Sequence, residues 1–399
     1  MNSDRYYSTK AQKMESSKIR EISKIIAERD IISLAGGMPS PSSFPIEIVS
    51  ELSEQLLKEK GAEALQYGTT TGYRKLKEVI ARRLNENFDM SVNGENILVT
   101  SGAQQALYLV GKVFVERDDE VVVEAPTYAS MLQILQELGG DVSDIELEKD
   151  GFAVDKFKKY LENGGNPKLS YFVPTFQNPS GITTSLRKRQ KLVDLAEAHD
   201  FLIVEDDPYH QLRYSGGSVP PIYSVDDNNR TIYVGTLSKL LAPGLRVGWI
   251  AARQEFIDKL QLAKQPVDLC TNVFSQHLAY RYLKGDIVDR QIEKIKNLYR
   301  AKRDHMLDAL QEFLPEKVDW TSPKGGMFIW LTLPEDIDAE EMFQDALDEG
   351  VAYVPGSIFY ANSPKKNTLR LNFTFVDEKE ITEGVKRLGR LIEEIIDRS

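Results

Sequence analysis

Lys239 is the side chain in this sequence whose surroundings most favour chemistry. It lies in the segment TLSKLLAPGLRVGWI, between two apolar runs and close to Thr236, Ser238 and Arg246. A lysine that is poorly hydrated and close to another cation has a lowered pKa, and its neutral amine is a nucleophile. A lone lysine is more often a solvated surface residue, so the functional interpretation depends on the residues that surround it.

Polar and aromatic residues follow five apolar runs that are typical of buried strands. The runs are Ile97–Thr100, Val121–Glu124, Tyr171–Pro174, Phe201–Glu205 and Ile232–Gly235. The residues after them are, in chain order, 101–104, 125–128, 177–181, Asp206 with Tyr209, and 236–239. Ligands of open α/β sheets bind beyond the carboxyl ends of the strands. One pocket shared by five strand ends is therefore the economical explanation.

Together these residues could bind a charged ring that carries a phosphate. The Ser-Gly-Ala turn at 101–103 offers backbone N–H groups and the positive end of a helix dipole to a phosphate. Tyr128 offers a flat face for stacking, and Asp206, at the end of an apolar strand, could pair with a protonated ring nitrogen. Asn178 and Tyr209 could donate hydrogen bonds to a phenolate oxygen. Structural explanations stay open: Tyr128 as a core or interface aromatic, Asp206 as a helix N-cap, and the other two as turn or packing residues.

The elements that must position these residues alternate along the chain. Helical patterns at 103–116 and 186–199 lie between the apolar runs, and a sixth run follows at Val247–Ala251. Uninterrupted apolar runs indicate strands buried on both faces. The alternation predicts an α/β fold, with a mainly parallel central sheet and helices on both of its faces.

The two ends of the chain predict a smaller α+β domain. A helical stretch near 273–313 is followed by strands at Met327–Leu333 and Leu369–Phe373 and by helices near 339–348 and 377–396. At the N-terminus, residues 16–28 place four isoleucines on one helical face, and a Gly-, Pro- and Ser-rich loop follows. We expect residues 1–45 to form an N-terminal arm and helix that join the small domain, 46–290 the large domain, and 291–399 the small C-terminal domain.

Composition excludes several classes of function. The 399 residues include 61 acidic and 50 basic side chains, a net charge of −11, which disfavours nucleic-acid binding. The single cysteine, Cys270, excludes an internal disulfide, and the four histidines have no metal-ligand spacing. Neither a signal peptide nor a run of about 18 apolar residues is present, so we expect a cytoplasmic protein without a metal or a membrane span.

The motifs in this order resemble those of the fold-type I pyridoxal-phosphate enzymes. The stretch around Lys239 is the most specific, and SGAQQAL, QNPSG and EDDPY support it by order and spacing. The chain resembles class I/II aminotransferases over about residues 19–390, and is most similar to the subgroup with 2-aminoadipate and kynurenine aminotransferases. The resemblance implies transfer of an amino group from an L-amino acid, possibly 2-aminoadipate, an aromatic or a branched-chain amino acid, to a 2-oxo acid, with glutamate and 2-oxoglutarate as the expected pair.

The resemblance also implies roles for individual residues. Lys239 would carry pyridoxal 5′-phosphate as a Schiff base and move the proton, Asp206 would pair with the pyridinium nitrogen, and Asn178 and Tyr209 would bind the ring O3′. Tyr128 would stack on the ring. The phosphate would be held by Ser101, Gly102, Ala103, Gln104, Thr236, Ser238 and Arg246. Ala103 stands where many family members have Ser or Thr, so one hydroxyl contact would be absent.

Four further residues are implied in substrate binding and subunit contacts. Arg370, in TLRLNF, would bind the substrate α-carboxylate as a bidentate fork, near Gly37 and Asn178. Arg20, in SSKIREISK, would meet a distal substrate group, although it could equally be a solvated helix residue. Tyr67, in QYGTTTGY, would reach the phosphate in the neighbouring subunit of a homodimer with shared active sites.

Three alternative functions compete with this interpretation. A PLP-dependent β-lyase or related carbon–sulfur lyase would use the same cofactor residues, so the sequence discriminates poorly against it. A ligand sensor of a transcription regulator would need a winged-helix module, but only about 18 residues precede the matching region. A purely structural protein would not need polar groups at five strand ends.

Overall fold

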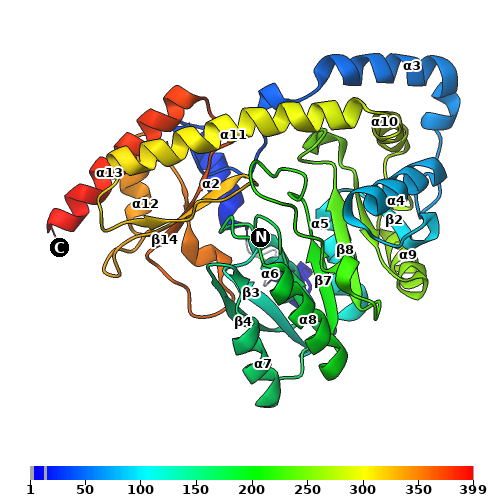
Figure 1. Ribbon diagram of the computed structural model, residues 1–399, viewed down its shortest axis with the longest axis horizontal. Helices are drawn as coiled ribbons and strands as arrows, with labels where there is room; N and C mark the ends of the chain where they lie inside the picture. The colour runs from blue at the N-terminus through cyan, green and yellow to red at the C-terminus, as the bar shows by residue number, and fades with distance from the viewer. Residues whose placement is uncertain (1–3, 13–15, 399) are drawn as a thin grey trace.

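An eight-stranded sheet forms the centre of the computed structural model, which describes residues 4–12 and 16–398 (Figure 1). The strand order is β2-β9-β8-β7-β6-β3-β4-β5. The strands are β2 (Ile97–Thr100), β3 (Glu120–Ala125), β4 (Asp141–Glu148), β5 (Gly151–Phe152), β6 (Leu169–Phe172), β7 (Leu202–Asp206), β8 (Thr231–Thr236) and β9 (Gly248–Ala251). Only β9 and β5 run antiparallel to their neighbours in this sheet. The predicted mainly parallel α/β sheet is therefore confirmed.

Helices cover both faces of this sheet because successive strand residues point to opposite sides. Val121 and Val123 of β3 belong to the main hydrophobic cluster, whereas Val122 joins a second cluster formed with α7 and α8. The burial of both faces explains the uninterrupted apolar runs of the sequence. The helices of this part are α4 (Arg74–Phe88), α5 (Ala103–Phe114), α6 (Ala129–Leu138), α7 (Val154–Glu162), α8 (Leu186–His199) and α9 (Gln254–Asp268).

The helical stretch expected near 273–313 is two helices. They are α10 (Val273–Leu283), which packs on α3 (Ile46–Ala64), and α11 (Ile287–Phe313). The break falls at the Lys-Gly-Asp segment 284–286, where glycine lowers helix propensity. From there α11 runs across the molecule and packs along α13 (Glu378–Arg398) (Figure 1).

The N-terminal segment packs within the C-terminal part of the chain. Its strand β1 (Ile32–Ser33) pairs in parallel with β12 (Val351–Ala352). Helix α2 (Lys18–Ala27) buries Ile22 in a cluster with Trp330 and Phe359. The remaining elements here are β10 (Asp319–Trp320), β11 (Phe328–Thr332), β13 (Val354–Pro355) and β14 (Thr368–Asn372), which form an antiparallel sheet, and α12 (Met342–Asp348). The boundaries at 45/46 and 290/291 stay predictions.

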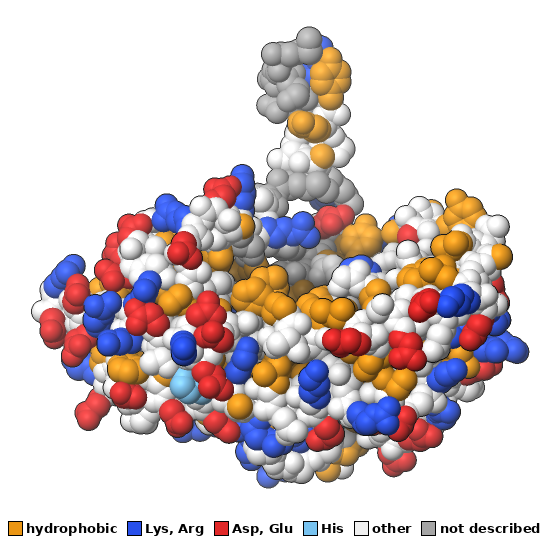
Figure 2. All heavy atoms as spheres, turned by 90° about the horizontal axis from the view of Figure 1, so that it is seen from above, with side chains coloured by type: hydrophobic (Ala, Val, Ile, Leu, Met, Phe, Trp, Pro, Cys, Tyr) orange, Lys and Arg blue, Asp and Glu red, His pale blue; other side chains and the backbone are white. Residues whose placement is uncertain are grey.

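Short helical turns connect these elements. They are η2 (Pro41–Ser43), η3 (Gly94–Asn96), η4 (Tyr223–Val225), η5 (Pro243–Leu245) and η6 (Gly356–Phe359). At the N-terminus, η1 (Asp4–Tyr6) and α1 (Thr9–Gln12) project from the body, and Tyr6 and Tyr7 are exposed (Figure 2).

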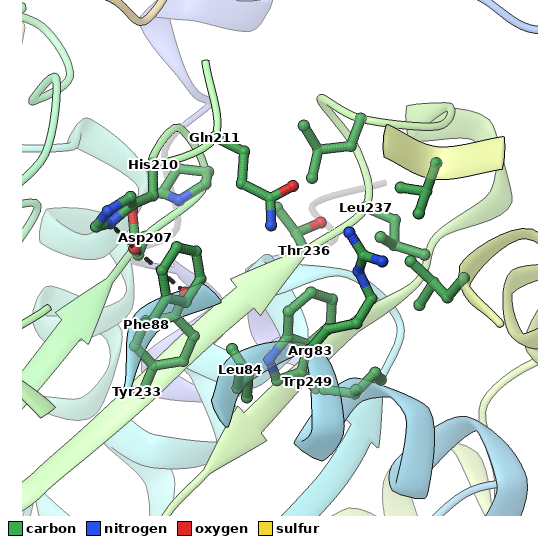
Figure 3. Close-up of a pocket in the computed structure, with 15 residues that line it drawn as sticks. Arg83, Leu84, Phe88, Asp207, His210, Gln211, Tyr233, Thr236, Leu237 and Trp249 are labelled. Carbon is green, nitrogen blue, oxygen red and sulfur yellow. Dashed lines mark hydrogen bonds and ion pairs between the residues drawn. The ribbon is translucent and has the colours of Figure 1, made fainter. Parts of the chain in front are cut away.

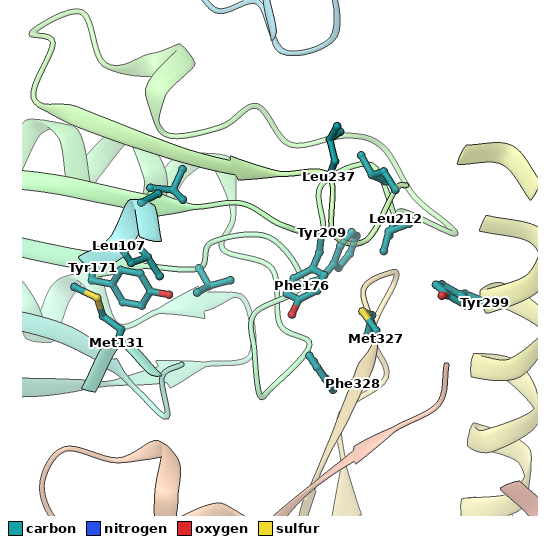
Figure 4. Close-up of a cluster of buried hydrophobic side chains, with 14 of the residues drawn as sticks. Leu107, Met131, Tyr171, Phe176, Tyr209, Leu212, Leu237, Tyr299, Met327 and Phe328 are labelled. Atoms are coloured by element: carbon teal, nitrogen blue, oxygen red, sulfur yellow. The ribbon is translucent and has the colours of Figure 1, made fainter. Parts of the chain in front are cut away.

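One hydrophobic cluster joins the large sheet to the small one. Tyr171 and Phe176 contribute from β6 and the loop after it, and Tyr209 from the loop after β7. Phe328 of β11 and Tyr299 of α11 extend the cluster to the other side (Figure 4). Aromatic side chains bury large areas, so this cluster holds the two parts together directly beneath the strand ends.

Within the described ranges, 4–12 and 16–398, no helix combines the length and the apolar character needed to cross a bilayer. The same ranges contain no grouping of three or more His, Cys, Asp and Glu side chains suited to a metal ion.

Candidate active site at the carboxyl edge of the sheet

The five predicted strand ends meet at one edge of the sheet. Strands β2, β3, β6, β7 and β8 all point the same way, because β9 is antiparallel to both β2 and β8. The loops that follow these strands therefore leave the sheet on the same side.

The turn between β2 and α5 forms an anion cradle together with Arg246. Gly102 has φ 78°, and a Cβ there would lie 2.4 Å from Arg246 Nη2, so the close approach requires glycine. Arg246 Nη2 donates to the Ser101 carbonyl at 3.1 Å. An open surface hollow beside this turn is lined by Ser101, Gln104 and Arg246, among others.

Of the predicted cradle residues, Ser101 and Gly102 have backbone N–H groups that are already bonded, so the free N–H groups begin at Ala103. The Ser101 N–H donates to Gln105 Oε1 at 2.7 Å, and the Gly102 N–H donates to the Thr100 carbonyl at 2.8 Å. Helix α5 begins at Ala103. In the described part of the chain, the N–H groups of residues 103–105 have no acceptor, as expected for the first turn of a helix.

Asp206 ends β7 as a buried carboxylate with one free oxygen. Its side chain is 4% exposed, and Oδ2 accepts a hydrogen bond of 2.8 Å from the Tyr171 hydroxyl. Oδ1 is buried and has no partner among the described residues. Burial raises the pKa of Asp206 to about 7, and Asp207 adds to the increase, while the bond from Tyr171 opposes it. A cationic donor facing Oδ1 would stabilise the charged form.

Lys239 follows β8 and points to the N-terminal segment. Its Nζ donates to the Gly37 carbonyl at 2.9 Å. Burial lowers the pKa of Lys239 to about 8, and the nearby Arg370 and Arg246 lower it further. This amine is thus neutral in a substantial fraction of molecules slightly above neutral pH, which suits a nucleophile or a proton acceptor.

Arg370 on β14 is the second cation of the site. It is 2% exposed; Nη1 donates to Asn178 Oδ1 and Nη2 to the Ala35 carbonyl, both at 2.8 Å. The guanidinium lies 4.2 Å from the ring centre of Phe328. Burial lowers its pKa to about 10. Its Nε is buried without a partner among the described residues, and each terminal nitrogen keeps a further N–H for an anion.

Two tyrosines border the space between these charges. Tyr209 is buried, lies within hydrogen-bonding reach of Asn178, and meets Phe328 edge to face. Burial raises the pKa of both Tyr209 and Tyr128, so both hydroxyls are protonated donors at neutral pH. The Tyr128 hydroxyl lies 3.3 Å from Gln104 Oε1, on the side of the cradle.

Thr236 and Ser238 hold the turn that carries Lys239. The two hydroxyl oxygens are 2.9 Å apart, and the Ser238 N–H donates to Thr236 Oγ1. The Thr236 hydroxyl is therefore engaged within the turn that leaves β8, whereas the Ser238 hydroxyl accepts there and can still donate to an anion.

Three residues that support the site were not identified from the sequence. Tyr171 holds Asp206, and the sequence feature that could have indicated this is a hydroxyl at the start of the apolar run Tyr171–Pro174. Gln177 and Glu124 hold the loop that carries Asn178. Gln177 Oε1 accepts from Ser180, and its Nε2 donates to the Pro126 carbonyl at 2.6 Å and to Glu124 Oε2 at 3.2 Å.

Two predicted residues lie apart from this group of contacts. Tyr67 is 80% exposed, in the segment after α3. Arg20 is exposed on α2, and its side chain has no hydrogen bond or ion pair within the described residues. The segment that follows α2 reaches the site through the carbonyls of Ala35 and Gly37.

A separate pocket lies beside the Lys239 loop (Figure 3). Of the predicted site residues it includes only Thr236; its other polar and charged lining includes Arg83, Asp207, His210 and Gln211. His210 Nδ1 is 3.0 Å from Asp207 Oδ2, which also accepts from the Tyr233 hydroxyl at 3.2 Å. This pocket lacks the Lys239 and Arg370 cations.

The residues present fit pyridoxal phosphate. Free N–H groups beside Arg246 suit its phosphate, the orphaned Asp206 Oδ1 suits its ring nitrogen, and the Lys239 amine suits its aldehyde.

Comparisons with known proteins agree with this geometry. The family model described as "Aminotransferase class I and II" matches residues 29–388. Aromatic-amino-acid aminotransferase 1 of Thermococcus litoralis is 49% identical over 395 residues, which cover 98% of this chain and 95% of that protein.

Two solved structures are similar over almost their whole length. Kynurenine aminotransferase of Pyrococcus horikoshii, in complex with PMP, is 46% identical with a TM-score of 0.95 and covers 99% of this chain and 98% of its own. LysN, an alpha-aminoadipate aminotransferase of Thermus thermophilus complexed with N-(5′-phosphopyridoxyl)-L-leucine, is 36% identical with a TM-score of 0.93 and covers 100% of both chains. The chain therefore belongs to the class I and II aminotransferases and is a pyridoxal-phosphate enzyme that transfers amino groups.

Proposed function

We propose that Lys239, Asp206 and Tyr209 are the catalytic residues of this aminotransferase and that Arg370 binds the substrate α-carboxylate. The observation that carries the proposal is the pair of buried cations, Lys239 and Arg370, each facing a carbonyl of the N-terminal segment. A β-lyase would use the same residues, but the relatives described above are all aminotransferases, so lyase activity is not favoured.

Proton transfer is assigned to the Lys239 amine. When bound, pyridoxal phosphate accepts the amino group and delocalises the electron pair left when the substrate Cα–H bond breaks. With a pKa near 8, Lys239 can take the proton from the substrate Cα and return it to another carbon. Burial restricts the access of water to this amine.

Asp206 has an electrostatic role. Its free Oδ1 would accept a hydrogen bond from the ring nitrogen and keep that nitrogen protonated, which maintains the ring as an acceptor of electrons. Tyr171 holds the other oxygen and so orients the carboxylate.

Arg370, Asn178 and Tyr209 orient the substrate. The Asn178 amide accepts from Arg370 through Oδ1, so its N–H₂ group is free to donate toward the ring O3′ with Tyr209. The N–H groups that remain on Arg370 would bind the α-carboxylate. Gly37 would lie beside that carboxylate.

Phosphate binding is assigned to the cradle. Ala103, Gln104 and Arg246 would contact it directly, with Gly102 permitting the close approach. Ser101, Thr236 and Ser238 would shape the cradle, and Tyr128 would stack on the ring.

Large or acidic amino acids are the proposed donors, with glutamate and 2-oxoglutarate as the usual pair. The named relatives act on aromatic amino acids, kynurenine and alpha-aminoadipate, which supports a broad substrate range. Arg20 is assigned to the recognition of a distal acidic group, since α2 leads directly into the segment that contacts Lys239 and Arg370.

A homodimer is the proposed assembly, and the cytoplasm the proposed location. Tyr67 and Leu65 are 80% and 73% exposed. A second copy that receives Tyr67 at its phosphate would bury this apolar surface.

Replacing Lys239 tests the reaction itself. Lys239→Ala should lower transamination by about 10²-fold or more and abolish the covalent cofactor linkage seen by mass spectrometry after borohydride reduction. Lys259→Ala, on the exposed face of α9, should change neither. Wild-type protein should turn over repeatedly only when 2-oxoglutarate is supplied, and without it should release no more oxo acid than there are active sites; repeated turnover without an acceptor would contradict the transferase assignment.

Asp206→Asn should remove a pH dependence of stability. Because burial raises the pKa of Asp206 to about 7, the cofactor-free folded chain holds a proton that the unfolded chain releases near pH 4, and stability falls as pH rises between these values. Between pH 5.5 and 8 the free energy of unfolding of the wild type should fall by about 2 kcal/mol relative to Asp206→Asn. Urea unfolding of the cofactor-free proteins measures this. A difference that stays constant with pH would show that Asp206 is not the titrating group.

Arg20→Ala should lower kcat/KM for 2-aminoadipate and glutamate relative to leucine by about tenfold, the effect of one lost charge-assisted hydrogen bond. Lys24→Ala, which removes an exposed charge from the same helix, is the matched control. An unchanged preference in Arg20→Ala would remove this residue from the substrate site.

Tyr67→Phe should weaken pyridoxal-phosphate affinity by roughly two- to tenfold, while light scattering still gives the mass of a dimer. Tyr7→Phe, another exposed tyrosine, should leave the affinity unchanged. A monomeric mass for the wild type would exclude shared active sites.

A further inference from the structure

A network of hydrogen-bonded side chains outside the site holds the cradle turn in place. It starts at Gln105 on α5, whose amide has two partners. Oε1 accepts the Ser101 N–H at 2.7 Å, and Nε2 donates to Asp268 Oδ2 at 2.7 Å. The Gln105 amide thus connects the turn at 101–102 to the last residue of α9.

Asp268 accepts hydrogen bonds from three side chains. Its Oδ2 accepts from Gln105 Nε2 at 2.7 Å and, more weakly, from the Ser101 hydroxyl at 3.4 Å, and its Oδ1 accepts from Lys264 Nζ at 2.6 Å. The Lys264 side chain is completely buried, whereas that of Asp268 is 22% exposed. An ionised carboxylate is an acceptor at both oxygens, but an amide accepts at only one end. Among side chains of this size, only aspartate can accept from both Gln105 Nε2 and Lys264 Nζ.

The carboxylate also determines which way the Gln105 amide points. Nε2 must face Asp268, so Oε1 must face the Ser101 N–H. With that N–H occupied, the N–H groups of residues 103–105 are the ones left free beside Arg246. Gln105 and Asp268 therefore determine that the Ser101 N–H is not among the donors available to an anion.

We propose that Gln105, Asp268 and Lys264 are positioning residues for the cofactor phosphate, acting by fixing the cradle turn. This inference rests on the proposed function, in which the cradle binds that phosphate. None of the three side chains is required to touch the phosphate itself.

Charge and geometry predict opposite effects for Asp268. A carboxylate close to a phosphate repels it, so its neutralisation alone would strengthen phosphate binding. Lys264 offsets much of that repulsion in the wild type through its ion pair with Asp268. If the carboxylate acts by orienting Gln105, its neutralisation weakens phosphate binding instead. Asp268→Asn separates the two effects, because asparagine keeps the size and loses one acceptor.

The test compares pyridoxal phosphate with pyridoxal, which lacks only the phosphate. Dissociation constants for both are measured by absorbance on the full-length chain freed of cofactor. Asp268→Asn and Gln105→Leu should each reduce the preference for pyridoxal phosphate by about tenfold and leave the affinity for pyridoxal unchanged. The double variant should lose less than the sum of the two single losses, because both residues hold the same turn through their shared hydrogen bond.

Asp258→Asn is the matched control, an exposed aspartate on the same helix, and its preference should equal that of the wild type. A preference that rises or stays constant in Asp268→Asn would overturn the inference, as would an equal loss of affinity for pyridoxal. Gln105→Leu provides the same test if Asp268→Asn does not fold. A wild-type chain with no preference for pyridoxal phosphate would instead count against the proposed phosphate cradle.

Discussion

Asp206 is held through one carboxylate oxygen by Tyr171 and keeps the other oxygen free within the protein interior. A buried carboxylate in this arrangement loses hydration, and its pKa rises to about 7. The free oxygen therefore needs a cationic partner, and a protonated ring nitrogen supplies both the charge and the hydrogen bond. The remaining groups of the site are arranged around the position that this pairing defines, because they must reach the aldehyde and the phosphate of the same ring.

Two buried cations complete the electrostatics of the site. Lys239 and Arg370 come from the large and the small sheet, and both donate to carbonyls of the segment that follows β1. Burial lowers the pKa of both side chains, and the charge of Arg370 contributes to the lowered pKa of Lys239. A chain with a net charge of −11 thus concentrates positive charge where an amino acid's carboxylate and a phosphate would bind.

Supporting side chains outside the pocket restrict how the binding groups can be oriented. Gln177 and Glu124 anchor the loop that carries Asn178, as Gln105 and Asp268 anchor the turn at 101–102. In both places an amide side chain accepts a backbone N–H and donates to a carboxylate, which selects the orientation of the amide. Such networks reduce the number of arrangements open to a loop, which is the requirement for a site that must hold a ring at a fixed angle.

Sequence by itself determined the class of fold, the strands of the large sheet other than β4 and β5, and most of the residues that the structure brings together. Uninterrupted apolar runs identified β2 and β3, and the periodic pattern at 186–199 identified α8 with its observed bounds. Local patterns carry this information because side-chain periodicity depends on neighbours in the chain. Only the tertiary structure decided that β9 runs antiparallel, that α10 and α11 are separate helices, and that Tyr171, Gln105 and Asp268 support the site. These features depend on contacts between residues far apart in the sequence, such as Gln105 with Asp268, and no local spacing records a hydrogen bond that exists only after the chain has folded.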